Sequence, residues 1–197
     1  MLVFLLFILV ETISVSCNLF CPCGCFSESP KQIDILSWQL VTVSDKYEEL
    51  DPGTLHAYNQ VVKVLFIDER NLVFNRELSN GLPYGSVYAC SPAPIQAIQT
   101  IASIEIKSNS ETAYLNATDI IKVGDPITDR FVMSLFFDKS LRPVHEFINS
   151  LVLYDQDKYQ LRLKEKPFQE TNLNFDVIIT LSDGKVFELK NEMLLVN

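Results

Sequence analysis

Apolar and polar residues alternate most clearly in the C-terminal half of the chain. Every second residue is apolar in the segments 159–164 and 175–181, and this period of two is typical of a strand with one buried face. Phe187 and Leu189 continue the alternation after Asp183-Gly184, a dipeptide that favours the positive φ angles of a tight hairpin turn. The pattern therefore predicts that 175–181 and 186–189 pair antiparallel across Asp183 and Gly184.

Other apolar runs are short and are separated by Pro, Gly, Asn, Asp and Ser. The run FVMSLFF at 131–137 is apolar at nearly every position, which predicts a central strand buried on both faces. Short strands punctuated by turn residues are typical of an all-β sandwich or barrel. We therefore expect a mainly β fold, an antiparallel β-sandwich that is immunoglobulin-like or related, with further strands at 33–43, 61–67, 72–74, 86–90 and 104–107.

One segment has the period of a helix instead. Val144, Phe147, Ile148 and Leu151 are spaced at i, i+3, i+4 and i+7, and Pro143 precedes them. Proline is favoured where a helix begins. The spacing predicts one short helix over 144–151.

The first ten residues are apolar without exception. A helix of ten residues is about 15 Å long and does not cross a hydrocarbon core of roughly 30 Å, so the run suits a secretory signal. Ser14 and Ser16 lie at positions −3 and −1 relative to Cys17, and small residues there predict cleavage after Ser16. A cysteine directly after the cut is the acceptor of a lipoprotein acyl chain such as palmitate. The alternative is an uncleaved anchor over 1–20, whose only charge is Glu11.

The chain is accordingly expected to have three parts. Residues 1–16 form a signal peptide, 17–31 a lipid-anchored tether that begins at Cys17, and 32–197 the β-sandwich domain. This organisation predicts an exported protein held at the cell envelope, in the outer membrane or on the cell surface. The formal net charge of −9 argues against a nucleic-acid partner, because such a partner needs a cationic surface.

The remaining cysteines do not indicate a metal site. Cys21, Cys23 and Cys25 lie in the tether and Cys90 lies in the domain. Their C-x-C-x-C spacing differs from the paired C-x₂₋₄-C units of structural zinc. Disulfides, further acylation or free thiols are the interpretations that we retain for these four residues.

No catalytic residue and no cofactor is predicted. The chain contains no G-x-S-x-G elbow, no glycine-rich phosphate loop and no H-E-x-x-H pair. Its two histidines, His56 and His145, are interpreted as surface or half-buried residues. Asp125 and the pair at 155 and 157 lack the spacing of a calcium loop. The acids predicted to lie in turns, where a solvated Asp is ordinary, are Asp138, Asp155, Asp157 and Asp183.

Aromatic side chains offer a route to sugar binding by stacking. The candidates are Trp38, Tyr84, Tyr88 and Tyr114. Packing in the core is the interpretation that we favour for each of them.

Three segments of the chain carry a resemblance to a known group of proteins: Cys17, the CPCGC cluster at 21–25 and LSDGKVFEL at 181–189. In these segments the chain resembles small envelope lipoproteins from Bacteroidota that have no assigned activity. The resemblance implies an N-terminal lipid anchor, a β-sandwich domain and a location in the envelope.

Three functional hypotheses follow. The first is a non-enzymatic module that binds a protein or a glycan through its loops. The second is a secreted or anchored glycan hydrolase, which would need two carboxylates brought together by the fold. The third is a structural or assembly subunit, which would offer an edge strand to a neighbour.

Overall fold

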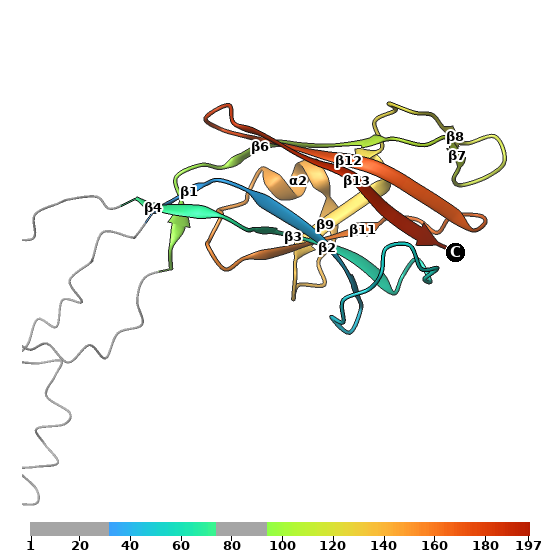
Figure 1. Ribbon diagram of the computed structural model, residues 1–197, viewed down its shortest axis with the longest axis horizontal. Coiled ribbons are helices and arrows are strands. Elements are labelled where there is room, and N and C mark those ends of the chain that lie inside the picture. The colour runs from blue at the N-terminus through green and yellow to red at the C-terminus, as the bar shows by residue number, and fades with distance from the viewer. Residues whose placement is uncertain (1–31, 74–93) are drawn as a thin grey trace, which may run out of the picture.

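The computed structural model describes residues 32–73 and 94–197 of the chain. It shows a mainly β fold with antiparallel sheets and one short helix (Figure 1). The predicted fold class is therefore confirmed. The expected signal peptide, the tether and the strand at 86–90 lie outside the described residues.

One layer of the sandwich is a five-stranded sheet in the order β10-β9-β11-β3-β2. All of its neighbouring strands are antiparallel. Its strand β3, which lies between β11 and β2, has the sequence VVKVLFI and is buried at six of its seven positions. The strands are β2 (Trp38–Ser44), β3 (Val61–Ile67), β9 (Phe131–Leu135), β10 (Arg142–Pro143) and β11 (Lys158–Leu163).

The other layer is a three-stranded antiparallel sheet in the order β13-β12-β6. It consists of β6 (Ile101–Ser108), β12 (Thr171–Leu181) and β13 (Val186–Val196). The predicted hairpin is confirmed, because β12 and β13 pair with Ile179 opposite Phe187. Gly184 in its turn has φ +87°, the positive angle for which glycine is suited.

A smaller sheet extends the sandwich at the end where the described chain begins. It has the order β4-β1-β5, from β1 (Gln32–Ile35), β4 (Arg70–Val73) and β5 (Gln96–Ala97). The predicted strand over 33–43 is wrong as one element, since Leu36 and Ser37 separate β1 from β2. At this break Leu36 N–H donates to Glu69 O at 2.9 Å. The pair β1–β5 is parallel.

Apolar side chains from both layers meet in one core. β12 contributes every second residue from Leu173 to Leu181 to this core, which explains its alternating sequence. Facing residues include Met133 and Tyr159 of the five-stranded sheet. In Figure 1 the strands β6, β12 and β13 lie over β2, β3, β9 and β11, with α2 (Val144–Ile148) between the layers. The two layers therefore form a sandwich.

The helix is shorter than the sequence indicates. Val144, Phe147 and Ile148 are buried as predicted, and the helix ends at Ile148, before Leu151.

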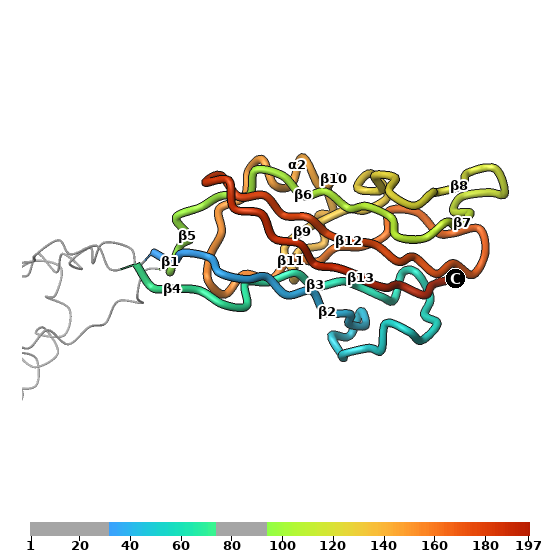
Figure 2. The backbone as a smooth tube through the Cα atoms, turned by 45° about the horizontal axis from the view of Figure 1, so that its top comes forward, coloured from blue at the N-terminus to red at the C-terminus, as the bar shows by residue number. Residues whose placement is uncertain are grey.

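Two short strands, β7 (Thr112–Ala113) and β8 (Ile120–Ile121), pair with each other. Figure 2 shows them at the end of the domain opposite to the sheet of β4, β1 and β5. A 3₁₀ turn η2 (Thr128–Arg130) precedes β9.

The prediction for 131–137 is wrong at its end. β9 stops at Leu135, and a turn follows in which Asp138 N–H donates to Leu135 O at 2.9 Å. Phe137 is 82% exposed rather than buried. An apolar run is buried only where other elements pack against it, and here that packing ends before Phe137.

Candidate functional site

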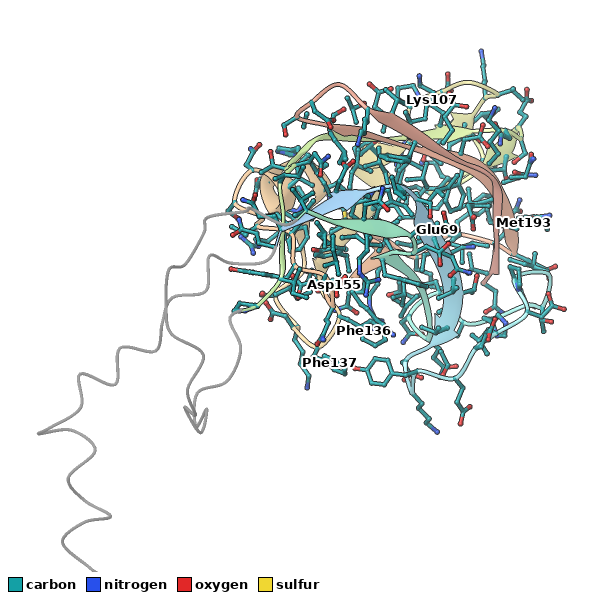
Figure 3. All side chains as sticks on the ribbon, turned by 60° about the vertical axis from the view of Figure 1, so that its left-hand side comes forward. Glu69, Lys107, Phe136, Phe137, Asp155 and Met193 are labelled. Carbon is teal, nitrogen blue, oxygen red and sulfur yellow. The ribbon has the colours of Figure 1, made fainter. Side chains whose placement is uncertain are left out.

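Three aromatic rings gather on the outside of the five-stranded sheet. We call Tyr47, Phe136 and Phe137 the aromatic surface. The ring centroids are 4.6 Å apart for Tyr47–Phe136, 5.8 Å for Tyr47–Phe137 and 5.1 Å for Phe136–Phe137. Tyr47 is 50% exposed, and Phe137 is the most exposed large apolar residue of the described chain. Figure 3 shows Phe136 and Phe137 together at the periphery of the domain.

The turn that carries Tyr47 is held by local hydrogen bonds. The Ser44 side-chain oxygen accepts from the backbone N–H groups of Lys46 (3.2 Å) and Glu48 (3.1 Å). Tyr47 N–H donates to Ser44 O at 2.9 Å, and Tyr47 has φ +68°. A positive φ in a tyrosine is uncommon and needs surrounding structure to maintain it. Ser44 therefore fixes the backbone that presents the Tyr47 ring.

A buried polar side chain, that of Gln160, holds the turn after β9 that carries Phe136 and Phe137. The Gln160 side chain on β11 is 5% exposed, and its amide donates to Ser134 Oγ and to Asp138 O, both at 2.6 Å. Phe136 N–H donates to Lys158 O at 2.8 Å. These bonds connect the turn after β9 to β11, so the two phenylalanines occupy fixed positions.

The aromatic surface continues into apolar side chains beneath it. A second cluster of buried residues, Val43, Val62 and Val64, lies on the face of the sheet that points away from the core. Phe136 and the half-buried Phe66 pack against this cluster. Near the aromatic surface, the outer face of the sheet thus carries packed apolar side chains in place of the polar side chains of an ordinary solvent-exposed face.

A second feature is a hollow of about 390 Å³ between the segments 57–59 and 166–170. Its walls include two rings, the half-buried Tyr58 and Phe168, which is 48% exposed. Polar side chains complete the lining, among them Asn59, Gln169 and Glu170. Among the described residues that line this hollow, Glu170 is the only one with a carboxylate side chain.

The acids singled out in the sequence do not meet in a site. Asp138 accepts hydrogen bonds from the side chain and backbone of Ser140, which hold the pKa of its carboxyl below the usual value. Asp183 accepts from Lys185 N–H, which likewise lowers its pKa. Asp155 forms an ion pair with Arg70, and burial raises the pKa of Asp157. Each acid thus has its own local environment, and all four lie in or beside turns as predicted.

The histidines and the aromatic candidates are placed mostly as interpreted. His145 is exposed, and His56 is half-buried. Trp38 and Tyr114 are in the core at 5% and 0% exposure, so core packing is confirmed for these two. Tyr84 and Tyr88 lie outside the described residues, as do Cys17, Cys21, Cys23, Cys25 and Cys90.

Within 32–73 and 94–197, no group of three or more His, Cys, Asp or Glu side chains is arranged to hold a metal ion. No helix in this part of the chain is long and apolar enough to cross a membrane.

Sequence reasoning missed both the aromatic surface and the hollow. The three rings come from two turns almost ninety positions apart, and periodicity carries no information on such pairing. One feature of the sequence could have indicated the exposed rings. Phe136 and Phe137 stand directly before Asp138-Lys139, and such polar turn residues indicate that the strand ends there.

Comparison with known proteins gives little similarity. No family model matches the chain, and no curated protein matches its sequence. Two solved structures match at a TM-score of 0.31 and 6% sequence identity: "Streptococcus agalactiae AgI/II polypeptide BspA C terminal domain (WT)" and "BspA_C_WT". Each match covers 81% of this chain and 49% or 50% of the solved chain. The chain therefore spans about half the length of the structures that it matches.

Proposed function

We propose that this protein is a non-enzymatic binding module of the cell envelope, which binds a protein partner through its aromatic surface. The observation that carries the proposal is the 82% exposure of Phe137 beside the rings of Tyr47 and Phe136. Exposed apolar patches on a folded domain mark interaction sites. Aromatic side chains are also the residues that dominate binding energy at protein interfaces.

The ring geometry favours a protein partner over a sugar at this surface. The three ring planes are tilted by 53°, 65° and 68° to one another, so they do not form a flat stacking platform. Phe137 instead protrudes from its neighbours and suits insertion into a pocket. A pocket that receives one ring, with others sealing its rim, is the arrangement of an interface hot spot.

The fixed backbone around the rings supports binding as well. The hydrogen bonds of Ser44 and Gln160 order both turns before any partner arrives. Preorganised side chains lose less conformational entropy on association. The nearest acid in the turn, Asp138, is already engaged by Ser140, which favours a binding role over proton transfer.

The envelope location rests on the N-terminal sequence. The apolar run 1–10, the small residues Ser14 and Ser16, and Cys17 directly after them support a lipid-anchored protein. Residues 17–31 would act as a tether between the lipid and the sandwich. The aromatic surface would then meet partners close to the membrane.

The test is site-specific photo-cross-linking in source cells. A photoreactive phenylalanine analogue replaces Phe137 in the full chain, and a matched variant carries it at Val186, which is 55% exposed on the other sheet. We expect one discrete adduct from position 137 and none from position 186. The Tyr47→Ala substitution in the same chain should reduce the adduct from position 137.

Identification of the adduct allows affinity to be measured with the purified partner. Phe137→Ala should weaken binding about 30-fold, as for an interface hot spot, while Val186→Ala should leave it unchanged. Equal adducts from both positions, no adduct from position 137, or full affinity of Phe137→Ala would overturn the proposal.

A further inference from the structure

We propose that the hollow between 57–59 and 166–170 is a binding site for a neutral saccharide. This site shares no residue with the aromatic surface, so the inference is independent of the proposed protein partner. It is carried by the shape of the hollow, its two rings and its unengaged polar side chains.

The walls of the hollow are fixed by backbone hydrogen bonds. Tyr58 N–H donates to Asn197 O at 3.2 Å, and Asn197 N–H donates to His56 O at 3.1 Å. On the other wall, Phe168 N–H donates to Tyr114 O at 2.9 Å, and Pro167 is buried. The hollow therefore exists before a ligand binds. Its volume of about 390 Å³ lies in the usual range of small-molecule sites.

The two rings supply apolar faces next to polar groups. Tyr58 packs against the core with part of its ring still accessible, and Phe168 is half exposed. A saccharide has the matching character, since its C–H groups form apolar patches and its hydroxyl groups form a polar rim. Aromatic side chains with one apolar and one wet side are suited to such amphipathic ligands.

The polar side chains of the hollow are available to a ligand. Within the described part of the chain, no hydrogen bond or ion pair occupies the side chains of Asn59, Lys166, Gln169 or Glu170. Asn and Gln amides each present donors and an acceptor, and a sugar hydroxyl also donates and accepts. The four side chains can therefore bind several hydroxyl groups of one ligand.

The charge of the hollow selects a neutral ligand. Lys166 and Glu170 are its only charged side chains among the described lining residues, and they offset each other. A phosphate or a sulfated sugar would require an excess of cations, as in sites built on Arg and Lys. A single carboxylate side chain, that of Glu170, also falls short of the pair of Asp or Glu residues that most glycoside hydrolases use, which favours binding over cleavage.

The experiment uses the full chain in a detergent without a sugar headgroup. Cellobiose, maltose, lactose and N,N′-diacetylchitobiose are added separately, and binding is followed by calorimetry and by amide chemical shifts. We expect at least one disaccharide to bind and to shift the amide signals of Tyr58, Phe168 and Gln169. Inorganic phosphate is titrated as the charged comparison and should cause no such shift.

Variants assign the binding to the hollow. Gln169→Ala and Phe168→Ala should each weaken binding about tenfold, as expected for a lost hydrogen bond or ring contact. Gln39→Ala, at an exposed position of β2, and Phe137→Ala in the aromatic surface should leave the affinity unchanged. The proposal is overturned if no disaccharide binds, if phosphate binds in its place, or if Gln169→Ala and Phe168→Ala bind like the wild type.

Discussion

Nζ of Lys63 lies 2.7 Å from Oε2 of Glu192, and this ion pair joins β3 of one sheet to β13 of the other. The Lys63 side chain is 2% exposed and Glu192 is 19% exposed. Burial lowers the pKa of Lys63, while the hydrogen bond and charge of Glu192 act in the opposite direction. The ring of Phe175 lies 6.0 Å from the same ammonium. Glu192 is therefore the anion that makes a charged lysine tolerable in the core.

Removing the negative charge of Glu192 should lower the stability of the fold. Glu192→Gln leaves the Lys63 ammonium buried without a counter-charge, and we expect it to lower the free energy of unfolding by about 3 kcal/mol. Urea denaturation measures the change. Glu188→Gln is the matched control on β13, because Glu188 pairs with Lys190 at the surface and exposed ion pairs contribute little to stability. Equal losses for the two variants would contradict the assigned role of Glu192.

A double replacement separates charge from packing. Lys63→Met with Glu192→Leu removes both charges and keeps apolar volume, and such replacements are often neutral or stabilising. We expect the double variant to recover most of the stability that Glu192→Gln loses. The measurement is the same urea denaturation.

Replacing Gly184 tests the turn that joins β12 to β13. Gly184→Val places a β-branched residue at φ +87°, and we expect a loss of about 1 kcal/mol or more. A Cβ at this position meets no atom within 4 Å, so the loss would come from the backbone and not from a clash. Gly53→Ala is the control, since Gly53 has no positive φ in this structure. Thermal unfolding that changes equally in both variants would count against the turn assignment.

Asp34 should contribute stability that depends on pH. The hydrogen bonds from Lys185 and Gln99 hold the pKa of its carboxyl below the ordinary aspartate value of 3.8. A carboxyl with a lowered folded pKa stabilises the fold above its unfolded pKa and loses that contribution as the pH falls through the folded pKa. Asp34→Asn should therefore be less stable than the wild type at neutral pH and show a shallower loss of stability below pH 3.8. Urea denaturation at a series of pH values provides the comparison.

Asp157 supplies a comparison of opposite sign. Burial raises its pKa, so its ionisation favours the unfolded chain as the pH rises through the unfolded pKa. Asp157→Asn should make the rise of stability with pH steeper in the acid range. Identical pH profiles for the two variants would show that neither shift acts on folding.

Replacing Cys17 tests the proposed lipid anchor. The wild type should take up labelled fatty acid and sediment with membranes, whereas Cys17→Ser should be released as a soluble, folded domain. The reason is that Ser14 and Ser16 still permit ordinary cleavage. Fractionation with fatty-acid labelling measures both properties. An unlabelled wild type, or a Cys17→Ser variant that stays in the membrane pellet, would favour an uncleaved anchor over 1–20.

The sequence predicted those elements whose pattern is local. The alternation in β12, the Asp183-Gly184 turn and the i, i+3, i+4 spacing of Val144, Phe147 and Ile148 each arise from contacts that every strand or helix of that kind makes. Strands of two residues, such as β5 and β10, are too short to show any period. They form because the surrounding structure places them beside a neighbour.

The candidate sites depend on contacts that are distant in the sequence. Lys63 lies in the apolar run VVKVLFI and would be expected at the surface, yet Glu192 allows it to be buried. Phe136 and Phe137 have the composition of a core strand, but the turn at Asp138 leaves Phe137 in solvent. The hollow joins 57–59 to 166–170, and nothing in either segment indicates the other. Such sites are set by the tertiary arrangement alone.

The strand order has a consequence for how the chain acquires its structure. β3 at Val61–Ile67 lies between β2 and β11, and β11 begins only at Lys158. Ribosomal synthesis therefore produces β3 long before the strand β11 that pairs with it. Sandwiches with such distant pairings fold in roughly milliseconds to seconds. The five-stranded sheet can therefore be completed only after β11 has been synthesised, so this half of the sandwich forms late in the life of the nascent chain.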